Sequence, residues 1–340
     1  MSILVSGGAG YIGSHTCVEL IQAGYDIVVA DNLVNASEEA VRRVERIVGR
    51  AVPFVKVDLC DPVGVEALFA EYPDIDAVIH FAALKAVGES VAKPLEYYTN
   101  NLVNTLTVLN AMRRHGVKNF VFSSSATVYG DPHTVPIRED FPLSTTNPYG
   151  TTKLFIERIL TDCCAADPTL NVALLRYFNP IGAHASGLIG EDPNGIPNNL
   201  VPYIAKVAVG QLKELHVFGS DWPTHDGTGV RDYIHVVDLA RGHVAALNKL
   251  DQNCGLFICN LGTGRGYSVL DVLHAYERAC GKTIPYVLDP RRPGDIAACW
   301  ADPSRALAEL GWQAEYGIDE MCASSWKWQS MNPNGYEEGV

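Results

Sequence analysis

Residues 7–13 read GGAGYIG, and this stretch decides the fold that we expect for the whole chain. It follows a short apolar run, Ile3–Ser6, and it opens a segment with helical spacing, Ile12–Ala23. Its glycines satisfy the spacing GxGxxG and also the variant GxxGxxG. Such glycines permit a tight turn and a close approach of backbone N–H groups to a pyrophosphate, and the helix dipole favours the anion. An ordinary strand-to-helix turn is the alternative, but this context favours a dinucleotide site.

Acidic residues end the next two expected strands. Asp31 comes 18 residues after Gly13, at the end of the strand-like run Asp26–Ala30. A carboxylate at that place accepts hydrogen bonds from both ribose hydroxyls and repels a 2′-phosphate, so we predict NAD rather than NADP. Asp58 ends the run Phe54–Val57, from which it can reach the adenine.

The first half of the chain alternates between strand-like and helix-like segments. This pattern predicts an α/β fold with a doubly wound (Rossmann) parallel sheet, helices on both faces, and sites at the carboxyl ends of the strands. Further expected strands are Ala77–Phe81, Phe120–Ser123 and Val172–Arg176, and the expected helices are Glu38–Val48, Leu102–Arg114 and Tyr149–Ala165.

The second half is rich in turns. His184–Asn199 reads as a long loop, and Gly219–Gly229 and Pro290–Gly294 are turn-rich as well. We therefore expect a dinucleotide domain over residues 1–179 and a smaller, mixed α/β substrate domain over 180–340. Tyr233–Val237 resembles a buried strand, and we expect it to return to the first sheet, within a return segment near 232–247.

Composition excludes several classes of protein. The formal net charge is −13, which disfavours nucleic acid as a partner because phosphate binding requires positive charge. No signal-peptide pattern and no run of 18 apolar residues occurs, so we expect no membrane association. The nine cysteines are scattered without a CxxC pair, which predicts a cytoplasmic protein without a disulfide framework or a metal site.

Two further stretches carry candidate catalytic residues, namely SSSATVYG at 123–130 and NPYGTTK at 147–153. Pro148 suits the first turn of a helix. Tyr149 and Lys153 are four residues apart, so they share one face of that helix. A surface helix with a solvated lysine is the structural alternative. The expected place of this helix, beside the nicotinamide end of the sheet, favours a catalytic pair.

A tyrosine beside a lysine suits proton transfer. The pKa of a free tyrosine is about 10, and a nearby ammonium and a positive nicotinamide ring both favour the phenolate. Lowering that pKa by ~3 requires about 4 kcal/mol of differential stabilisation. A phenolate near pH 7 can take a proton from a sugar hydroxyl while hydride leaves the same carbon, and a serine hydroxyl can bridge the transfer.

The chain closely resembles the extended short-chain dehydrogenase/reductase superfamily and, within it, the UDP-galactose (UDP-glucose) 4-epimerases. The resemblance covers essentially the whole chain. It implies that Ser125, Tyr149 and Lys153 are catalytic. The motifs that carry it are GGAGYIGSH, HFAALKAVGES, PLEYYTNN, FSSSATVYG, NPYGTTK, LLRYFNPIGAH, GIPNNL, DGTGVRDYIHV, NLGTG and RRPGD.

The resemblance also implies the residues that contact the ligands. For NAD they are Gly7, Gly10, Tyr11, Ile12, Gly13, Asp31, Asn32, Leu33, Asn35, Ala36, Asp58, Leu59, Phe81, Ala82, Ala83, Lys85, Asn100, Ser125, Tyr149, Lys153 and Phe178. For the UDP-sugar they are Ser125, Tyr149, Phe178, Asn179, Asn199, Leu200, Phe218, Arg231, Tyr233, Arg292, Asp295 and Cys299. The two arginines suit a diphosphate, to which arginine donates bidentate bonds, although a plain surface charge is the alternative for each.

The implied reaction is inversion at C4 of a UDP-hexose by transient oxidation to a 4-keto sugar. Related 4,6-dehydratases carry an Asp-Glu pair after the catalytic hydroxyl, whereas here Ala126-Thr127 follows Ser125. The alternatives are another NAD-dependent nucleotide-sugar epimerase or dehydratase of the superfamily, and a simple dehydrogenase, which would release reduced cofactor. A non-catalytic NAD-binding regulator is a further alternative, but it would not need Ser125, Tyr149 and Lys153 together. The resemblance further implies a homodimer through Leu102–Met112 and Leu154–Leu160, for which packing on the sheet is the structural alternative.

Cys299 lies in the stretch GDIAACWADP, residues 294–303. The implied reaction needs no covalent nucleophile, and no metal-ligand partners lie nearby in the sequence. In the family this position lies on the wall of the sugar pocket, where many bacterial members carry a tyrosine. The smaller side chain leaves room for an N-acetyl group, so we expect activity on UDP-N-acetylhexosamines as well.

Overall fold

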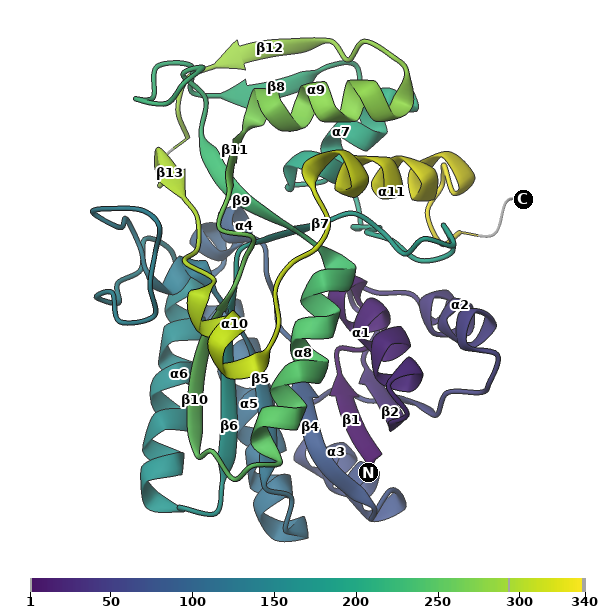
Figure 1. The fold of residues 1–340 in the computed structure, drawn as a ribbon. Helices are drawn as coiled ribbons and strands as arrows, with labels where there is room; N and C mark the ends of the chain where they lie inside the picture. The colour runs from purple at the N-terminus through teal and green to yellow at the C-terminus, as the bar shows by residue number, and fades with distance from the viewer. Residues whose placement is uncertain (1, 293, 338–340) are drawn as a thin grey trace.

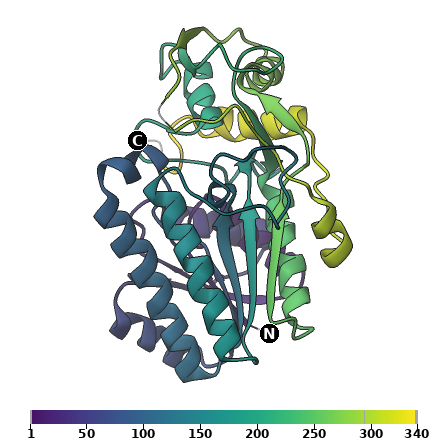
Figure 2. The ribbon, with the colours of Figure 1, turned by 90° about the vertical axis from the view of Figure 1, so that its left-hand side faces the viewer.

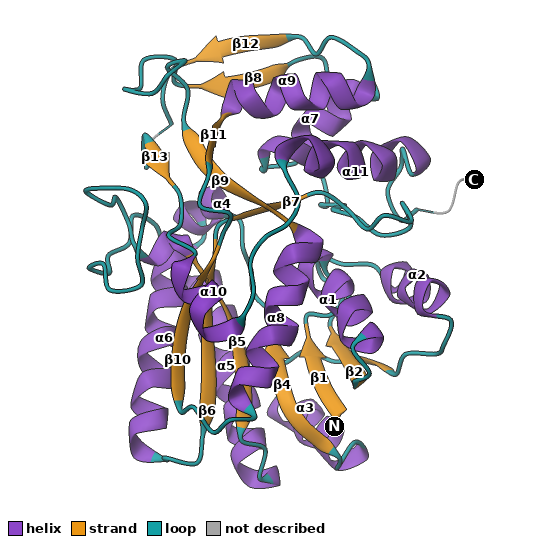
Figure 3. Cartoon of the chain, viewed as in Figure 1, coloured by secondary structure: helices purple, strands orange, loops and turns teal. Residues whose placement is uncertain are grey.

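A computed structural model describes residues 2–292 and 294–337; Pro293, which belongs to the RRPGD motif and to the turn expected at Pro290–Gly294, lies outside this part. Seven parallel strands form the large sheet, in the order β10-β6-β5-β4-β1-β2-β3 (Figures 1 and 3). The chain winds outward from β1 in both directions, which confirms the predicted doubly wound fold. The strands are β1 Ser2–Ser6, β2 Asp26–Asp31, β3 Phe54–Lys56, β4 Ile75–His80, β5 Asn119–Ser125, β6 Asn171–Tyr177 and β10 Leu256–Leu261.

Helices cover both faces of this sheet. Side chains alternate between the faces of a strand, so Ile3 and Val5 join one hydrophobic core while Leu4 joins the other. The first core is covered by α1 Tyr11–Gln22, α2 Glu38–Val48 and α8 Val236–Leu250, and the second by α3 Pro62–Glu71, α5 Pro94–His115 and α6 Pro148–Ala166. The short helix α4 Val87–Ala92 packs against α5 and α6.

Capping residues set the ends of the helices that matter for the site. In α2, Ser37 accepts a hydrogen bond from the N–H of Glu39, and Gly49 ends the helix with φ 71°. In α6, Asn147 Oδ1 accepts from the N–H of Gly150 at 2.8 Å, directly before Pro148. The cap and the proline together define where α6 begins, so the side chains of its first two turns are placed accurately.

A smaller region with its own sheets lies at the carboxyl ends of the large sheet's strands (Figure 1). The prediction that Tyr233–Val237 joins the first sheet is wrong. Its residues up to His235 form β9, the centre of the small sheet, and the following residues open α8. The small region contains β7 Asn179–Ile181, β8 Leu215–Phe218, β9 Val230–His235, β11 Gly266–Ser268, β12 Tyr286–Asp289, β13 Ala298–Cys299, α7 Leu200–Ala208, α9 Val269–Cys280 and α11 Ile318–Met331.

The chain returns to the large sheet through α8 and β10 instead. Helix α8 packs against α1, β10 pairs in parallel with β6, and α10 Ser304–Leu310 covers β10. The predicted loop His184–Asn199 contains neither helix nor strand, and all of its residues are described. Within the described residues, no helix is both long and apolar enough to cross a membrane.

Candidate active site

The glycine turn between β1 and α1 has no room for side chains. Gly7 has φ 73°, and a Cβ on it would lie 2.6 Å from the N atom of Ala82. A Cβ on Gly13 would lie 2.4 Å from the carbonyl oxygen of Gly7. Gly10 at the N-cap has no side chain to bond the first N–H groups of α1, which therefore stay available for an anion. The turn fits a pyrophosphate.

Asp31 lies at the carboxyl end of β2, next to this turn. Its carboxylate accepts hydrogen bonds from the N–H groups of Ala9 at 3.2 Å and Leu33 at 2.9 Å. Burial raises the pKa of Asp31, while these N–H groups act in the opposite direction. Asp58 accepts a bond from the N–H of Cys60. Each carboxylate oxygen keeps a lone pair, so both side chains suit the adenosine roles implied for them.

Glu191 was not anticipated from the sequence, yet it joins the two expected ligand sites. Its Oε1 accepts from Lys85 Nζ at 3.4 Å and from Asn199 Nδ2 at 2.9 Å. Lys85 was expected at the cofactor and Asn199 at the UDP-sugar. The only sequence signal was an acidic residue directly after an uncharged stretch of loop, Gly187–Gly190.

The candidate catalytic residues come together where β5 ends and α6 begins. Lys153 is buried, and its Nζ donates to the carbonyl oxygen of Ser123 at 2.7 Å. The same Nζ lies 4.8 Å from the centroid of the Phe122 ring and 5.9 Å from that of Tyr149. Ser125 is the last residue of β5, and its hydroxyl is near enough to Tyr149 to lower the pKa of the phenol. The alternative of a solvated lysine on a surface helix is therefore wrong.

Burial dominates the ionisation of this pair in the protein alone. It raises the pKa of Tyr149 to about 12, although the hydroxyl of Ser125 acts in the opposite direction. Burial lowers the pKa of Lys153 to about 7, partly offset by the negative charge of Glu157. Both shifts favour neutral side chains. Further positive charge near Tyr149 is thus needed before the phenolate becomes the stable form.

Strand pairing in the small sheet assembles the expected sugar side of the site. Arg231 lies opposite Cys299 in the β9–β13 pair, and Tyr233 lies opposite Asn179 in the β9–β7 pair. The guanidinium of Arg231 donates to the carbonyl oxygen of Val230 at 2.8 Å, which leaves other N–H groups for a ligand.

Arg292 approaches the same place from the segment before β13. Its Nε donates to Asp295 Oδ2 at 3.1 Å, and its guanidinium lies 4.7 Å from the centroid of the Phe218 ring. Burial raises the pKa of Tyr233 to about 12, and the charges of both Arg231 and Arg292 lower it. The two arginines therefore act on one region, as a diphosphate site requires.

Cys299 is 8% exposed and belongs to a small apolar cluster with Val128, Tyr129, Ile137, Phe178 and Ala301. Burial raises the pKa of its thiol to about 11. A neutral, buried thiol is a poor nucleophile and a poor metal ligand. Its surroundings support an interpretation in terms of side-chain volume.

The other predicted contacts occupy loops and strand ends around these groups. Phe81 packs on His243 with ring centroids 4.8 Å apart, and Asn100 donates to Asn101. Leu200 opens α7 behind Asn199. Asn32, Asn35 and Ala36 lie between β2 and α2, Leu59 is buried after Asp58, and Ala82 and Ala83 follow β4.

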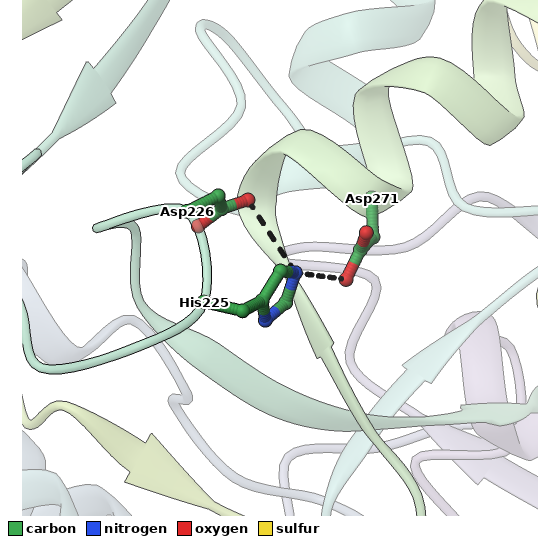
Figure 4. Close-up of side chains that lie close together, drawn as sticks. All are labelled: His225, Asp226 and Asp271. Carbon is green, nitrogen blue, oxygen red and sulfur yellow. Dashed lines mark ion pairs between the residues drawn. The ribbon is translucent and has the colours of Figure 1, made fainter.

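Three potential metal ligands meet at the start of α9, namely His225, Asp226 and Asp271 (Figure 4). His225 Nε2 lies 3.2 Å from Asp271 and 3.8 Å from Asp226. Both carboxylates already accept hydrogen bonds from Ser268, which is the N-cap of α9. These contacts account for the cluster structurally, and the absence of a metal stays a prediction.

Comparisons with known proteins agree with this geometry. A protein-family model described as the NAD dependent epimerase/dehydratase family matches residues 3–262. The chain is 64% identical over 337 residues to UDP-glucose 4-epimerase of Bacillus subtilis, covering 99% of each protein. It is 58% identical over 341 residues to the human UDP-glucose 4-epimerase, covering 98% of each.

A solved structure has the same fold throughout. The UDP-glucose 4-epimerase of Bifidobacterium longum, in complex with NAD+ and UDP, aligns with a TM-score of 0.96 at 60% identity, covering 98% of this chain and 100% of the other. Fold, site geometry and sequence identity lead to one conclusion: the chain belongs to the NAD dependent epimerase/dehydratase family.

Proposed function

We propose that the protein is an NAD-dependent isomerase that interconverts UDP-glucose and UDP-galactose by inversion at C4. The observation that carries the proposal is the group of Ser125, Tyr149 and Lys153 at the carboxyl end of β5. It lies at the same edge of the sheet as the glycine turn that follows β1. The B. longum relative, which binds NAD+ and UDP, supports the same pair of ligands here.

Proton transfer in this reaction belongs to Tyr149 and Ser125. Tyr149 takes the proton of the sugar 4-OH, directly or through Ser125, while hydride leaves C4. NAD supplies, when bound, the hydride acceptor and a positive ring. Lys153, held by Ser123, adds positive charge beside Tyr149. The 4-keto sugar then rotates about its linkage to UDP and presents the opposite face of C4. Hydride returns to that face, and Tyr149 returns the proton to the C4 oxygen.

Tight binding of the UDP moiety leaves the hexose free to rotate in the site. Arg231, Arg292 and Asp295 provide charged contacts for the diphosphate and the ribose of UDP, and Asn179 and Asn199 provide polar ones. Binding energy concentrated on UDP leaves the hexose loosely held, which inversion requires. In this proposal residues 1–179, together with α8 and β10, form the part that binds NAD, and the rest of residues 180–340 binds the UDP-sugar.

Cys299 extends the proposal to N-acetylated sugars. It lies in β13 opposite Arg231, it belongs to the same apolar cluster as Phe178 and Val128, and its side chain is short. A tyrosine there would add a ring to this space. We therefore infer that the enzyme also interconverts UDP-N-acetylglucosamine and UDP-N-acetylgalactosamine.

The test is incubation of the purified protein with UDP-galactose and, separately, with UDP-N-acetylgalactosamine, with both epimers quantified. Conversion of UDP-galactose without free NADH supports the epimerase, whereas stoichiometric NADH indicates a dehydrogenase. No conversion by NAD-loaded protein supports a non-catalytic regulator. Cys299→Tyr should abolish conversion of the N-acetyl sugar and spare UDP-galactose, and loss of both activities or of neither would refute the volume argument.

The proposal includes a homodimer. Helices α5 and α6 lie side by side on one side of the molecule (Figure 2) and expose apolar side chains, with Leu95 77%, Leu106 41% and Phe155 48% exposed. Solvent-exposed apolar residues gathered on two neighbouring helices are typical of an interface. A cytoplasmic location stays a prediction; all nine cysteines carry free thiols.

A further inference from the structure

A buried ion pair joins α6 to the sheet beside the candidate catalytic group. Glu157 of α6 and Arg176 of β6 have side chains that are 4% and 2% exposed. Arg176 donates from Nε to Glu157 Oε1 at 3.0 Å and from Nη2 to Oε2 at 2.7 Å. This is a bidentate fork, the arrangement that best restricts the relative orientation of the two side chains.

Further hydrogen bonds extend the pair into a network. Ser124 Oγ donates to Glu157 Oε1 at 2.5 Å. Arg176 Nη1 donates to Tyr129 OH at 2.9 Å and to the carbonyl oxygen of Glu139 at 3.1 Å. Tyr129 OH in turn donates to Asn260 of β10 at 2.7 Å. The pair thus binds α6, β5, β6 and β10 into one network.

The catalytic side chains lie on the same elements, close to this network. Glu157 follows Lys153 by four residues and Tyr149 by eight, so all three project from one side of α6. Ser124, which bonds Glu157, precedes Ser125 and lies opposite Arg176 in the β5–β6 register.

Two anchors on one helix face define both its rotation and its height above the sheet. Lys153 is anchored to Ser123, and Glu157 is anchored to Ser124 and Arg176 one turn later. The two anchors add to the packing of Ile156 and Leu160, which hold the same helix in the second core. With both anchors in place, Tyr149 at the start of α6 is directed at Ser125.

Stability alone does not explain this pair. Removing two charges from water is costly, and well-packed apolar side chains of similar size often stabilise a fold as well or better. The fork differs from them in holding one geometry, and proton transfer depends strongly on geometry. We propose that Glu157 and Arg176 are positioning residues that hold Tyr149 and Lys153 in register with Ser125. This inference rests on the proposed epimerase function.

The charge of Glu157 also reaches Lys153. Burial lowers the pKa of Lys153 to about 7, and Glu157 raises it. Other titratable or charged groups near Lys153 include Tyr149 on its own helix, His80 on β4 and, beyond Glu157, Arg176. Tyr177 of β6 interacts with Ser123 and with Tyr149. Loss of the negative charge at Glu157 therefore lowers the pKa of Lys153 further, whereas a shift in its position alone does not remove that charge.

Two variants of Glu157 separate geometry from charge. Glu157→Asp keeps the charge but shortens the side chain, and it should lower kcat about tenfold or more with an unshifted pH profile. Glu157→Gln keeps the length but loses the charge, and it should lower kcat about 100-fold and move the basic limb of the kcat profile to lower pH. In both, the KM for UDP-galactose and the NAD content of the purified enzyme should stay within about threefold of wild type.

A double variant covers the case in which Glu157→Gln fails to fold. Glu157→Met/Arg176→Met replaces the pair by apolar side chains of similar length and should fold, with kcat still about 100-fold low. Glu19→Gln is the matched control, because Glu19 pairs with Arg241 between α1 and α8, away from Tyr149, and is 13% exposed. It should keep wild-type kcat.

Wild-type kcat in the double variant would overturn the positioning role, since the pair would then serve stability alone. The same conclusion follows if Glu157→Asp keeps wild-type kcat, or if KM and NAD content change as much as kcat. Failure of the wild-type enzyme to epimerise UDP-galactose would instead reject the proposed function, so the two failures are distinguishable.

Discussion

Replacement of Tyr149 by phenylalanine tests the central chemical claim with the loss of one oxygen atom. The ring remains to pack at the start of α6, and Lys153 keeps its bond to Ser123. Only the group that exchanges a proton with the sugar 4-OH is lost. We expect turnover to fall while the fold and the NAD content are preserved.

The size of the effect follows from the ionisation of the site. Burial raises the pKa of Tyr149 to about 12 in the protein alone. Bringing that pKa to ~7 requires the phenolate to be stabilised by about 7 kcal/mol, for which Lys153 and the positive ring of bound NAD are the available charges. A base tuned in this way contributes about 10²–10⁴ in rate, and kcat of Tyr149→Phe should fall by that factor.

The assay is conversion of UDP-galactose to UDP-glucose at saturating substrate, with bound NAD quantified in the same preparation. The control is Tyr276→Phe, which removes a hydroxyl from another buried tyrosine in α9, away from β5 and α6. That variant should keep wild-type kcat. A kcat for Tyr149→Phe within about tenfold of wild type would refute the assignment of Tyr149 as the proton-transfer group.

Three further outcomes are expected. The carboxylate of Asp31 should make the enzyme prefer NAD over NADP by about tenfold or more in apparent affinity, and equal use of both would argue against its ribose role. Phe155→Glu should convert a dimer into a monomer at micromolar concentration by light scattering, and a wild-type monomer would reject the α5–α6 interface. Burial lowers the pKa of both His15 and His80 to about 3, whereas in the unfolded chain the pKa of a histidine is about 6.5. Between pH ~6.5 and ~3 the unfolded chain therefore binds protons that the native protein does not, and each of the two histidines lowers the free energy of unfolding by about 1.4 kcal/mol for every pH unit of acidification. Equal denaturant midpoints at pH 7 and pH 5 would contradict this.

Short local sequence patterns were sufficient to predict most of the helices and strands of the large sheet. Strand, glycine turn and helix follow one another within the first 22 residues, and the structure has them at the predicted places. The predicted bounds of α2, Glu38–Val48, are those observed. Such signals are readable because a helix or a tight turn depends on neighbours within a few residues.

Pairing between distant segments was not readable in the same way. Tyr233–Val237 has the apolar character of a buried strand, but that character does not say which sheet receives it. The seventh strand of the large sheet, Leu256–Leu261, was not expected at all. An apolar strand can pair with the edge strand of either sheet, and which sheet it joins depends on how the rest of the chain has packed.

The sequence by itself determined the dinucleotide turn and the Tyr149–Lys153 pair, because both depend on local spacing, and it determined the doubly wound class of the sheet through the alternation of strand-like and helix-like segments. Only the tertiary structure decided what surrounds them. Glu191 meets Lys85 from 106 residues away, and Arg176 meets Glu157 across a helix–sheet interface. Pairs of this kind form only after the backbone has brought two distant segments together, and no local sequence pattern records that event.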